Sequence, residues 1–303
     1  MSIKVGISPI AWQNDDLPDL TAAYSMDQAL SEASDIGYMG VERGRRMPAE
    51  TDKLSAYLQQ NNLELCGGWC SGNLMVNSVA DEIKAISQQV EQFVALRSPC
   101  LVYAECSNTI QGDRDTPVNN RPRLSRTEIE HYASKLSEVG KWMTEQGMVL
   151  AYHHHMGSMI ESQEDIDCLM SASTDDVSLL FDTGHLHFGG GDIMATLETW
   201  GHRIKHVHFK DVRESITHKM RVENRSFLDA VIAGAFTVPG DPQGCIDFQA
   251  VTDKLKQMDY AGWIVVEAEQ DPSLAAPYEY SKLGYAHIVE ICKNSGLSIA
   301  TRN

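Results

Sequence analysis

Short apolar runs alternate along the chain with longer segments in which apolar positions recur at helical spacing. A short apolar run is typical of a buried strand, and apolar positions three or four residues apart are typical of an amphipathic helix. Helical spacing is clearest at 26–36, 78–95, 126–146 and 278–294. We expect strands at 3–7, 38–42, 64–68, 100–104, 149–153, 177–181, 204–209 and 263–267.

Eight strands that alternate with helical segments are the element count of a (β/α)8 barrel. A doubly wound sheet is the alternative, but it normally carries a glycine-rich turn after its first strand. The turn at 8–12 reads Ser-Pro-Ile-Ala-Trp and contains no glycine. No low-complexity run or shift in composition divides the chain. We therefore predict an α/β fold with a single TIM-barrel domain over 1–303.

Two loops are longer than the barrel pattern needs, one at 106–124 and one at 211–247. We expect a short helix around 227–233 within the second. The loops that follow barrel strands carry function, so both insertions are consistent with coverage of a substrate. A surface excursion or a contact between subunits explains them equally well, and a homo-oligomer therefore stays open.

Composition narrows the classes of function. The 303 residues include 25 Lys and Arg against 42 Asp and Glu, which gives a formal net charge of −17. This charge repels a phosphate backbone and argues against nucleic-acid binding. No apolar stretch reaches the roughly 18 residues of a membrane span. The N-terminus lacks a secretion signal, and seven scattered cysteines without a CxxC pair are typical of reduced thiols, so we predict a cytoplasmic protein.

Acidic, histidine and lysine side chains gather where the predicted strands end. In a TIM barrel these strand ends converge on one face, around one cavity. Carboxylate and imidazole donors without a thiolate suit Mn²⁺, Co²⁺, Fe²⁺ or Mg²⁺, and Zn²⁺ less specifically. The residues concerned are Glu42, Glu105, His153, His154, His155, Asp182, His185, His206, His208, Lys210, Glu267 and Glu269.

Each of these residues also has an ordinary structural explanation. Asp182 follows a strand directly, where an aspartate is often a helix N-cap. A single buried histidine is more often a hydrogen-bonded core residue than a ligand. His206 and His208 project to the same side of their strand, which makes the pair more specific than either residue alone. The coincidence at four strand ends favours a metal site over four unrelated explanations.

Three segments resemble the xylose-isomerase-like TIM-barrel superfamily of sugar isomerases, epimerases and dehydratases. They read FDTGH at 181–185, HVHFKD at 206–211 and GWIVVE at 262–267. The stretches AYHHHMGS at 151–158 and VEAEQDP at 266–272 are similar to inosose dehydratases of inositol catabolism. The resemblance implies a hydro-lyase that converts an inosose, a cyclic polyol ketone, into a trihydroxycyclohexane-dione and water. It also implies a divalent metal, most readily Mn²⁺ or Co²⁺, with Mg²⁺, Fe²⁺ and Zn²⁺ as alternatives.

The resemblance further implies the metal ligands. In the superfamily the metal is held by Glu, Asp, His and Glu from strands five to eight, and Asp182, His208 and Glu267 match the last three. The strand-five position departs from the pattern, because His153 stands where many members have Glu. We expect Glu161 to reach back from the following loop, since a carboxylate keeps the charge of the site. The alternative is a histidine from 153–155.

Dehydration of a β-hydroxy ketone needs a base with a pKa near neutrality and a group that assists the leaving hydroxyl. The resemblance places His185 beside the aspartate ligand, in contact with substrate or metal. We expect His185 or His155 to be the base and Lys210 to protonate the hydroxyl or stabilise the enolate. Substrate contacts are expected from Trp12, Arg45, Arg46, His153 and Glu269.

Other interpretations remain for the pocket and for the function. Trp12 is equally well explained as a core aromatic, and Arg45 and Arg46 as surface charge. The same barrel and metal set also serve ketose 3-epimerases and aldose–ketose isomerases, because a fold does not fix a reaction. A carbohydrate-binding barrel without activity is the non-enzymatic alternative. Loss of water from an inosose separates dehydration from epimerisation and isomerisation, which keep the formula.

Overall fold

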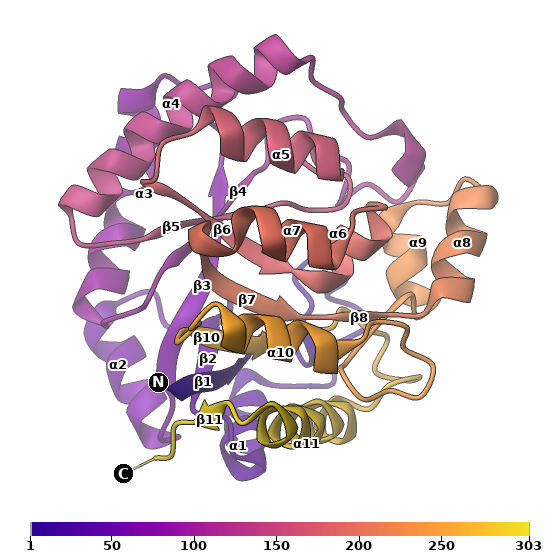
Figure 1. Cartoon of the computed structure of the whole chain (residues 1–303). Helices are drawn as coiled ribbons and strands as arrows, with labels where there is room; N and C mark the ends of the chain where they lie inside the picture. Colours follow the sequence, from indigo (N-terminus) through magenta and orange to yellow (C-terminus); the bar gives the residue numbers. More distant parts are fainter. Residues whose placement is uncertain (1, 303) are drawn as a thin grey trace.

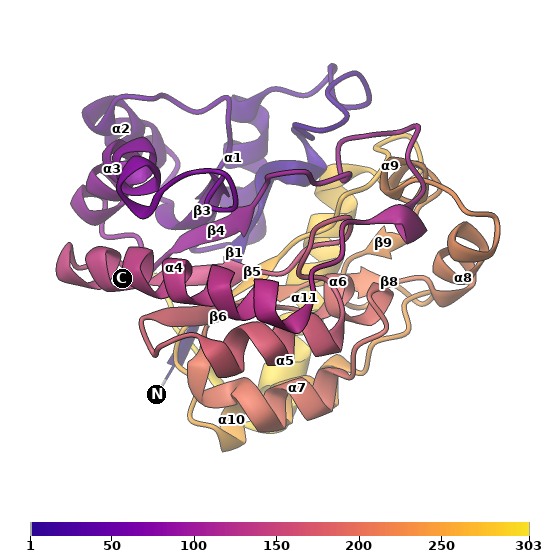
Figure 2. The ribbon, with the colours of Figure 1, turned by 90° about the horizontal axis from the view of Figure 1, so that it is seen from above.

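Parallel strands form a ring at the centre of the molecule, and helices cover the outside of the ring (Figures 1 and 2). The structure is a computed structural model and describes residues 2–302. The main strands are β1 (Ser2–Ile7), β2 (Gly40–Arg43), β3 (Glu64–Gly72), β4 (Leu101–Glu105), β5 (Leu150–His153), β6 (Val177–Asp182), β7 (Ile204–Phe209) and β10 (Trp263–Val266).

The strand pairing closes the barrel. Each main strand pairs with the next in chain order, and β1 also pairs in parallel with β10. This arrangement confirms the predicted (β/α)8 fold. The short strand β11 (Ser298–Ile299) pairs with β1, so the first and last strands lie side by side. β8 (Asp211–Val212) and β9 (Phe236–Thr237) form a separate antiparallel pair.

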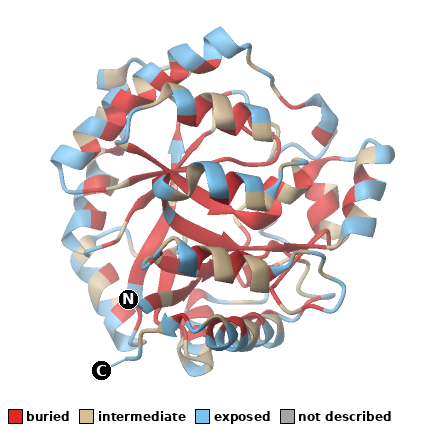
Figure 3. Ribbon diagram, viewed as in Figure 1, coloured by how far each residue is buried: buried red, intermediate tan, exposed pale blue. Residues whose placement is uncertain are grey.

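The helices bury their apolar sides against the barrel and expose their polar sides (Figure 3). All four segments with the clearest helical spacing form helices, and a further helix at 214–222 was not expected. In the described part of the chain, no helix combines the length and apolar character that a membrane span requires. The helices are α1 (Met26–Ile36), α2 (Thr51–Gln60), α3 (Val79–Ala95), α4 (Arg126–Glu145), α5 (Gln163–Ala172), α6 (Thr183–Phe188), α7 (Ile193–Trp200), α8 (Glu214–Val222), α9 (Phe227–Ile232), α10 (Phe248–Gln257) and α11 (Pro277–Ser295).

The two insertions pack against each other. They follow β4 and β7, so both begin at the carboxyl ends of strands. Pro117 and Ser226 form an antiparallel bridge between them, and the N–H of Val118 donates to the carbonyl of Arg225 at 2.9 Å. The predicted short helix forms as α9. A second apolar cluster joins the insertions to the loops beside them; its members include Val118, Met156, Phe188, Val212, Phe227 and Phe236.

Trp263 fills part of the barrel and needs glycine on the neighbouring strands. Gly6 of β1 is the register partner of Gly40 on β2. A Cβ atom on Gly40 would lie 2.6 Å from the Trp263 ring and 2.9 Å from the carbonyl oxygen of Glu64. Neither neighbour is the flexible end of a side chain, so neither moves aside easily. The indole therefore occupies space that a side chain at position 40 would take.

We expect Gly40→Ala to lower the free energy of unfolding by about 1–3 kcal/mol, because the added methyl group overpacks a rigid contact. Urea unfolding followed by far-ultraviolet circular dichroism measures this change. Gly112→Ala is the matched control, since a Cβ there meets nothing within 4 Å. Equal stability of the two variants would contradict the packing argument.

Candidate metal centre

Three predicted metal ligands lie together at the carboxyl ends of β6, β7 and β10. Asp182 is the last residue of β6, His208 is its register partner on β7, and Glu267 follows β10. Nδ1 of His208 is 2.5 Å from Oε2 of Glu267 and 3.4 Å from Oδ2 of Asp182. All three side chains are buried. Asp182 also caps α6, because its Oδ1 accepts from the N–H of His185 at 2.8 Å; cap and candidate ligand are the same residue.

The strand-five position differs from our first expectation. Nε2 of His153, the last residue of β5, lies 3.4 Å from Oδ2 of Asp182. The carboxylate of Glu161 is occupied elsewhere: its Oε2 accepts from the N–H of Gly157 at 2.8 Å, and its Oε1 lies 3.5 Å from Nε of Arg121. The loop after β5 thus turns this carboxylate toward an arginine. The structure does not bring Glu161 to the ligand group and places a histidine there instead.

Glu42 at the carboxyl end of β2 orients the histidines of β7. Its Oε1 lies 2.9 Å from Nε2 of His206 and 2.9 Å from Nε2 of His208. Burial alone would raise the pKa of Glu42, but the two imidazoles outweigh it and hold that pKa at about 2. A carboxylate that fixes the tautomer and direction of a ligating histidine is the usual outer partner in metal sites. In the sequence, Glu42 ends a predicted strand and His206 lies within another, but nothing there indicates that the two side chains meet.

The donor group suits a divalent cation. His208 donates Nε2–H to Glu42, which directs Nδ1 at the oxygens of Asp182 and Glu267, where it has no hydrogen bond of good geometry. Burial would lower the pKa of His208, but Glu267 and Glu42 raise it well above its usual value. The group therefore requires positive charge at this point, and a metal ion supplies it by replacing the proton. His153, Asp182 and His208 form one of the clusters close enough to share an ion.

Lys210 is the buried cation beside this group. Its Nζ lies 2.8 Å from Oε1 of Glu267, 2.9 Å from Oε2 of Glu269 and 2.9 Å from Nε2 of His185. Burial would lower the pKa of Lys210, but Glu267 and Glu269 outweigh it and raise that pKa. The side chain is therefore an ammonium ion at neutral pH, and it donates to the lone pair on Nε2 of His185.

His155 keeps one ring nitrogen free. Its Nδ1 donates to the carbonyl of Met156 at 2.8 Å, which leaves Nε2 as the lone-pair nitrogen. Its ring centroid is 3.9 Å from that of His185. Burial, with smaller contributions from His153 and Lys210, lowers the pKa of His155 to about 3. The imidazole is therefore neutral and its Nε2 lone pair is free, although this pKa lies below the near-neutral value expected of a general base.

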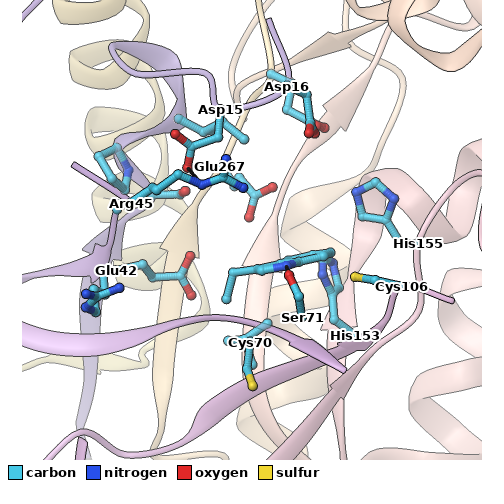
Figure 4. Close-up of a pocket in the computed structure, with 18 of the residues that line it drawn as sticks. Asp15, Asp16, Glu42, Arg45, Cys70, Ser71, Cys106, His153, His155 and Glu267 are labelled. Carbon is cyan, nitrogen blue, oxygen red and sulfur yellow. Dashed lines mark hydrogen bonds and ion pairs between the residues drawn. The ribbon is translucent and has the colours of Figure 1, made fainter. Parts of the chain in front are cut away.

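A cavity of about 440 Å³ borders the ligand group through His208 and Glu267, whereas Asp182, His185 and Lys210 are not among its lining residues. Figure 4 shows Arg45 on one side of the cavity and His155 on the other, with Glu267 between them. His153 and Glu269 also line it, so the predicted residues Arg45, His153, His155 and Glu269 share one space with His208 and Glu267. The volume lies within the range of small-molecule sites.

Two predicted substrate contacts lie outside the lining of the cavity. Trp12 is fully buried, and its Nε1–H donates to Glu32 at 2.6 Å, so it is a core aromatic. Arg46 is exposed to solvent and does not line the cavity. Arg45 does line it, and its guanidinium is 3.9 Å from Asp15. Of the alternatives left open by the sequence, the structural explanation holds for Trp12 and Arg46.

Trp69 is a lining residue that the sequence did not indicate. Its ring stands edge-on to the rings of His153 and His155, with centroids 5.6 Å apart in each pair. We expected the third strand to end at position 68, but β3 continues to Gly72 and carries Trp69 into the wall of the cavity. The indole supplies apolar surface beside the polar donors.

We expect His153→Ala to weaken Mn²⁺ binding by about 10- to 100-fold or more, because loss of even an outer partner of a metal site costs this much. Isothermal titration calorimetry on protein stripped with EDTA gives the affinity. Glu161→Gln should keep the affinity of the unmodified chain. The opposite result, with weak binding only in Glu161→Gln, would return the glutamate to the ligand set.

Comparisons with known proteins show which proteins this chain resembles. The chain is 40% identical over 301 residues to the rhizopine catabolism protein MocC of Rhizobium meliloti, covering 99% of this chain and 92% of that protein. It is also 40% identical to an inosose dehydratase of Clostridium botulinum, covering 95% of this chain and 97% of the relative.

Solved structures show the same fold at lower identity. A crystal structure of the IOLI protein with a bound zinc atom has a TM-score of 0.69 at 17% identity, covering 97% of this chain and 99% of that one. An L-ribulose 3-epimerase has a TM-score of 0.69 at 14% identity and covers 97% and 96%. The family described as "Xylose isomerase-like TIM barrel" matches residues 30–291. The chain belongs to the xylose isomerase-like TIM barrel family.

Proposed function

We propose that this protein is an inosose dehydratase, a hydro-lyase that removes water from a cyclic polyol ketone in inositol catabolism. The observation that carries the proposal is 40% identity over nearly the full length of a relative with that name. The buried donor group beside the cavity supports it, because this chemistry needs a cation and proton-transfer groups in one place. The seven cysteines are all free, which supports a reducing compartment such as the cytoplasm.

The reaction removes a proton next to the carbonyl and expels hydroxide from the neighbouring carbon as water, so the product has the formula of the substrate less one water. The negative charge of the enolate that forms in between must be stabilised. A divalent cation, when bound, acts as a Lewis acid toward the carbonyl. We propose Mn²⁺ or Co²⁺, held by Asp182, His208, Glu267 and His153, because oxygen and imidazole donors suit these ions.

His155 is better placed than His185 to remove the proton. The lone pair on Nε2 of His185 accepts from the ammonium of Lys210, while the lone pair on Nε2 of His155 is unengaged. His155 also lines the cavity. His185 then serves to position Lys210 and to hold the neighbouring ring.

Lys210 and Glu269 act on the leaving side of the reaction. The ammonium of Lys210 is a fixed positive charge that stabilises a developing oxyanion. Burial and the neighbouring Glu267 raise the pKa of Glu269 to about 7, against the opposing effect of Lys210. A carboxyl group with this pKa is partly protonated at neutral pH. It can therefore give a proton to the departing hydroxyl, as an efficient general acid does.

Incubation with scyllo-inosose should yield a product lighter by one water, with the ultraviolet absorption of an enolised dione. EDTA should abolish turnover because it removes the Lewis acid, and Mn²⁺ or Co²⁺ should restore it. Mass spectrometry and absorbance follow the reaction. A product of unchanged mass would instead assign the protein to the epimerases or isomerases.

We expect His155→Ala to reduce kcat by about 10²- to 10⁴-fold, the usual contribution of a general base. Stopped-time assays with metal-saturated protein measure the rate. His218→Ala, which removes a solvent-exposed histidine of α8, is the matched control and should keep full activity. Full turnover by His155→Ala would remove this residue from the mechanism.

A further inference from the structure

A second group of metal-binding side chains lies outside the barrel. His187 belongs to α6, Glu214 is the first residue of α8, and Cys245 lies in the loop before α10. Nε2 of His187 is 2.7 Å from Oε2 of Glu214 and 3.5 Å from Sγ of Cys245. All three donor atoms lie within 4.8 Å of one another. The proposed dehydration uses none of them.

This group is separate from the centre inside the barrel. His185 and His187 are two residues apart on α6, and successive helix positions differ by about 100°, so the two side chains point to nearly opposite sides. His185 is buried against Lys210, whereas the His187 side chain is 33% exposed. The first ring therefore faces Lys210 in the interior, and the second faces solvent.

The backbone around Cys245 is held firmly in place. Its N–H donates to the carbonyl of Val212 at 3.1 Å and to Oδ1 of Asp211 at 3.1 Å. A Cβ atom on Gly244 would lie within contact distance of the same carboxylate, so the chain approaches Asp211 closely here. The position of the thiol is thus set by β8 rather than by a free loop.

The donor types are those of a zinc site. Zn²⁺ takes thiolate, imidazole and carboxylate ligands at about 2.0–2.3 Å in tetrahedral geometry, and water often fills a fourth position. Ligand atoms in such a site are roughly 3–4 Å apart. The 3.5 Å between His187 and Cys245 lies in this range, and the 2.7 Å between His187 and Glu214 has to widen slightly around an ion. Among the described residues, no other candidate group contains a thiol. The exposure of Glu214, 61% for its side chain, leaves the site open to an incoming ion.

Local charge favours a cation here. Burial, followed by the nearby acids Asp211 and Glu214, raises the pKa of the Cys245 thiol to about 11. The free thiol is therefore protonated at neutral pH, and metal binding releases one proton as the S–H bond is replaced by a metal–sulfur bond. Asp211 and Glu214, which add to the effect of burial on the thiol, also attract a divalent ion.

We propose that His187, Glu214 and Cys245 bind one zinc ion, which ties both ends of the insertion at 211–247 to α6. Glu214 lies at the start of this insertion and Cys245 lies near its end, while α6 begins directly after Asp182. The ion therefore ties α6 to the two ends of the insertion, which already share the backbone hydrogen bond between Cys245 and Val212. Because it binds the folded chain, it stabilises that chain by mass action. This site does not depend on the proposed dehydratase activity.

Cobalt is the probe that separates the two sites. Untagged, reduced protein is stripped with EDTA and titrated with Co²⁺, and a thiolate ligand then gives a charge-transfer band in the near ultraviolet. The donors of the barrel centre are oxygen and nitrogen, so they do not give this band. We expect the band in the unmodified chain and in Cys168→Ser, a control that removes another partly exposed thiol, but not in Cys245→Ser.

Zinc content gives an independent measurement. After dialysis against Zn²⁺, the unmodified chain should hold one more zinc per chain than Cys245→Ser or His187→Ala, with a higher Tm. Dehydratase activity of the variants should be unchanged, so failure of the zinc site and failure of the proposed function are distinguishable. Absence of the charge-transfer band, or equal zinc content in all three proteins, would overturn the site.

Discussion

The side chains at the carboxyl end of this barrel are arranged so that buried negative charge is balanced. Glu267 and Glu269 both contact the single ammonium of Lys210, and Asp182 lies 3.8 Å from it. An ion pair of this kind is costly to break, since removal of one partner leaves uncompensated charge in a poorly solvated place. The Lys210 side chain needs glycine at position 184, because a Cβ atom there would lie 2.5 Å from Cγ of Lys210. The glycine of the FDTGH segment is therefore explained by the room that it leaves for Lys210.

The strand pattern predicts the fold and most of the centre. Parallel barrel strands align their carboxyl ends, so residues at those ends meet whatever their distance along the chain. This single rule brings Asp182, His208 and Glu267 together, along with Lys210 and Glu269. Alternation within β7 likewise explains why His206 and His208 both reach Glu42.

Loop geometry sets the limit of prediction from sequence. Glu161 lies beyond the end of β5, where no strand direction fixes its side chain, and Arg121 from a distant insertion attracts it. Trp69 was missed because β3 runs four residues further than its apolar pattern indicates. Trp12 lies beside a strand end yet turns into the core, where Glu32 satisfies its indole nitrogen. Each difference arises from long-range contacts that local spacing does not encode.

The contact between the two insertions has a consequence for how such barrels diversify. The segments at 106–124 and 211–247 share an apolar cluster and a backbone bridge, although more than one strand separates them around the ring. Neither segment alone buries all of its apolar side chains. Exchange of only one between related barrels would expose apolar side chains of the other to water, so we expect the two insertions to be exchanged together.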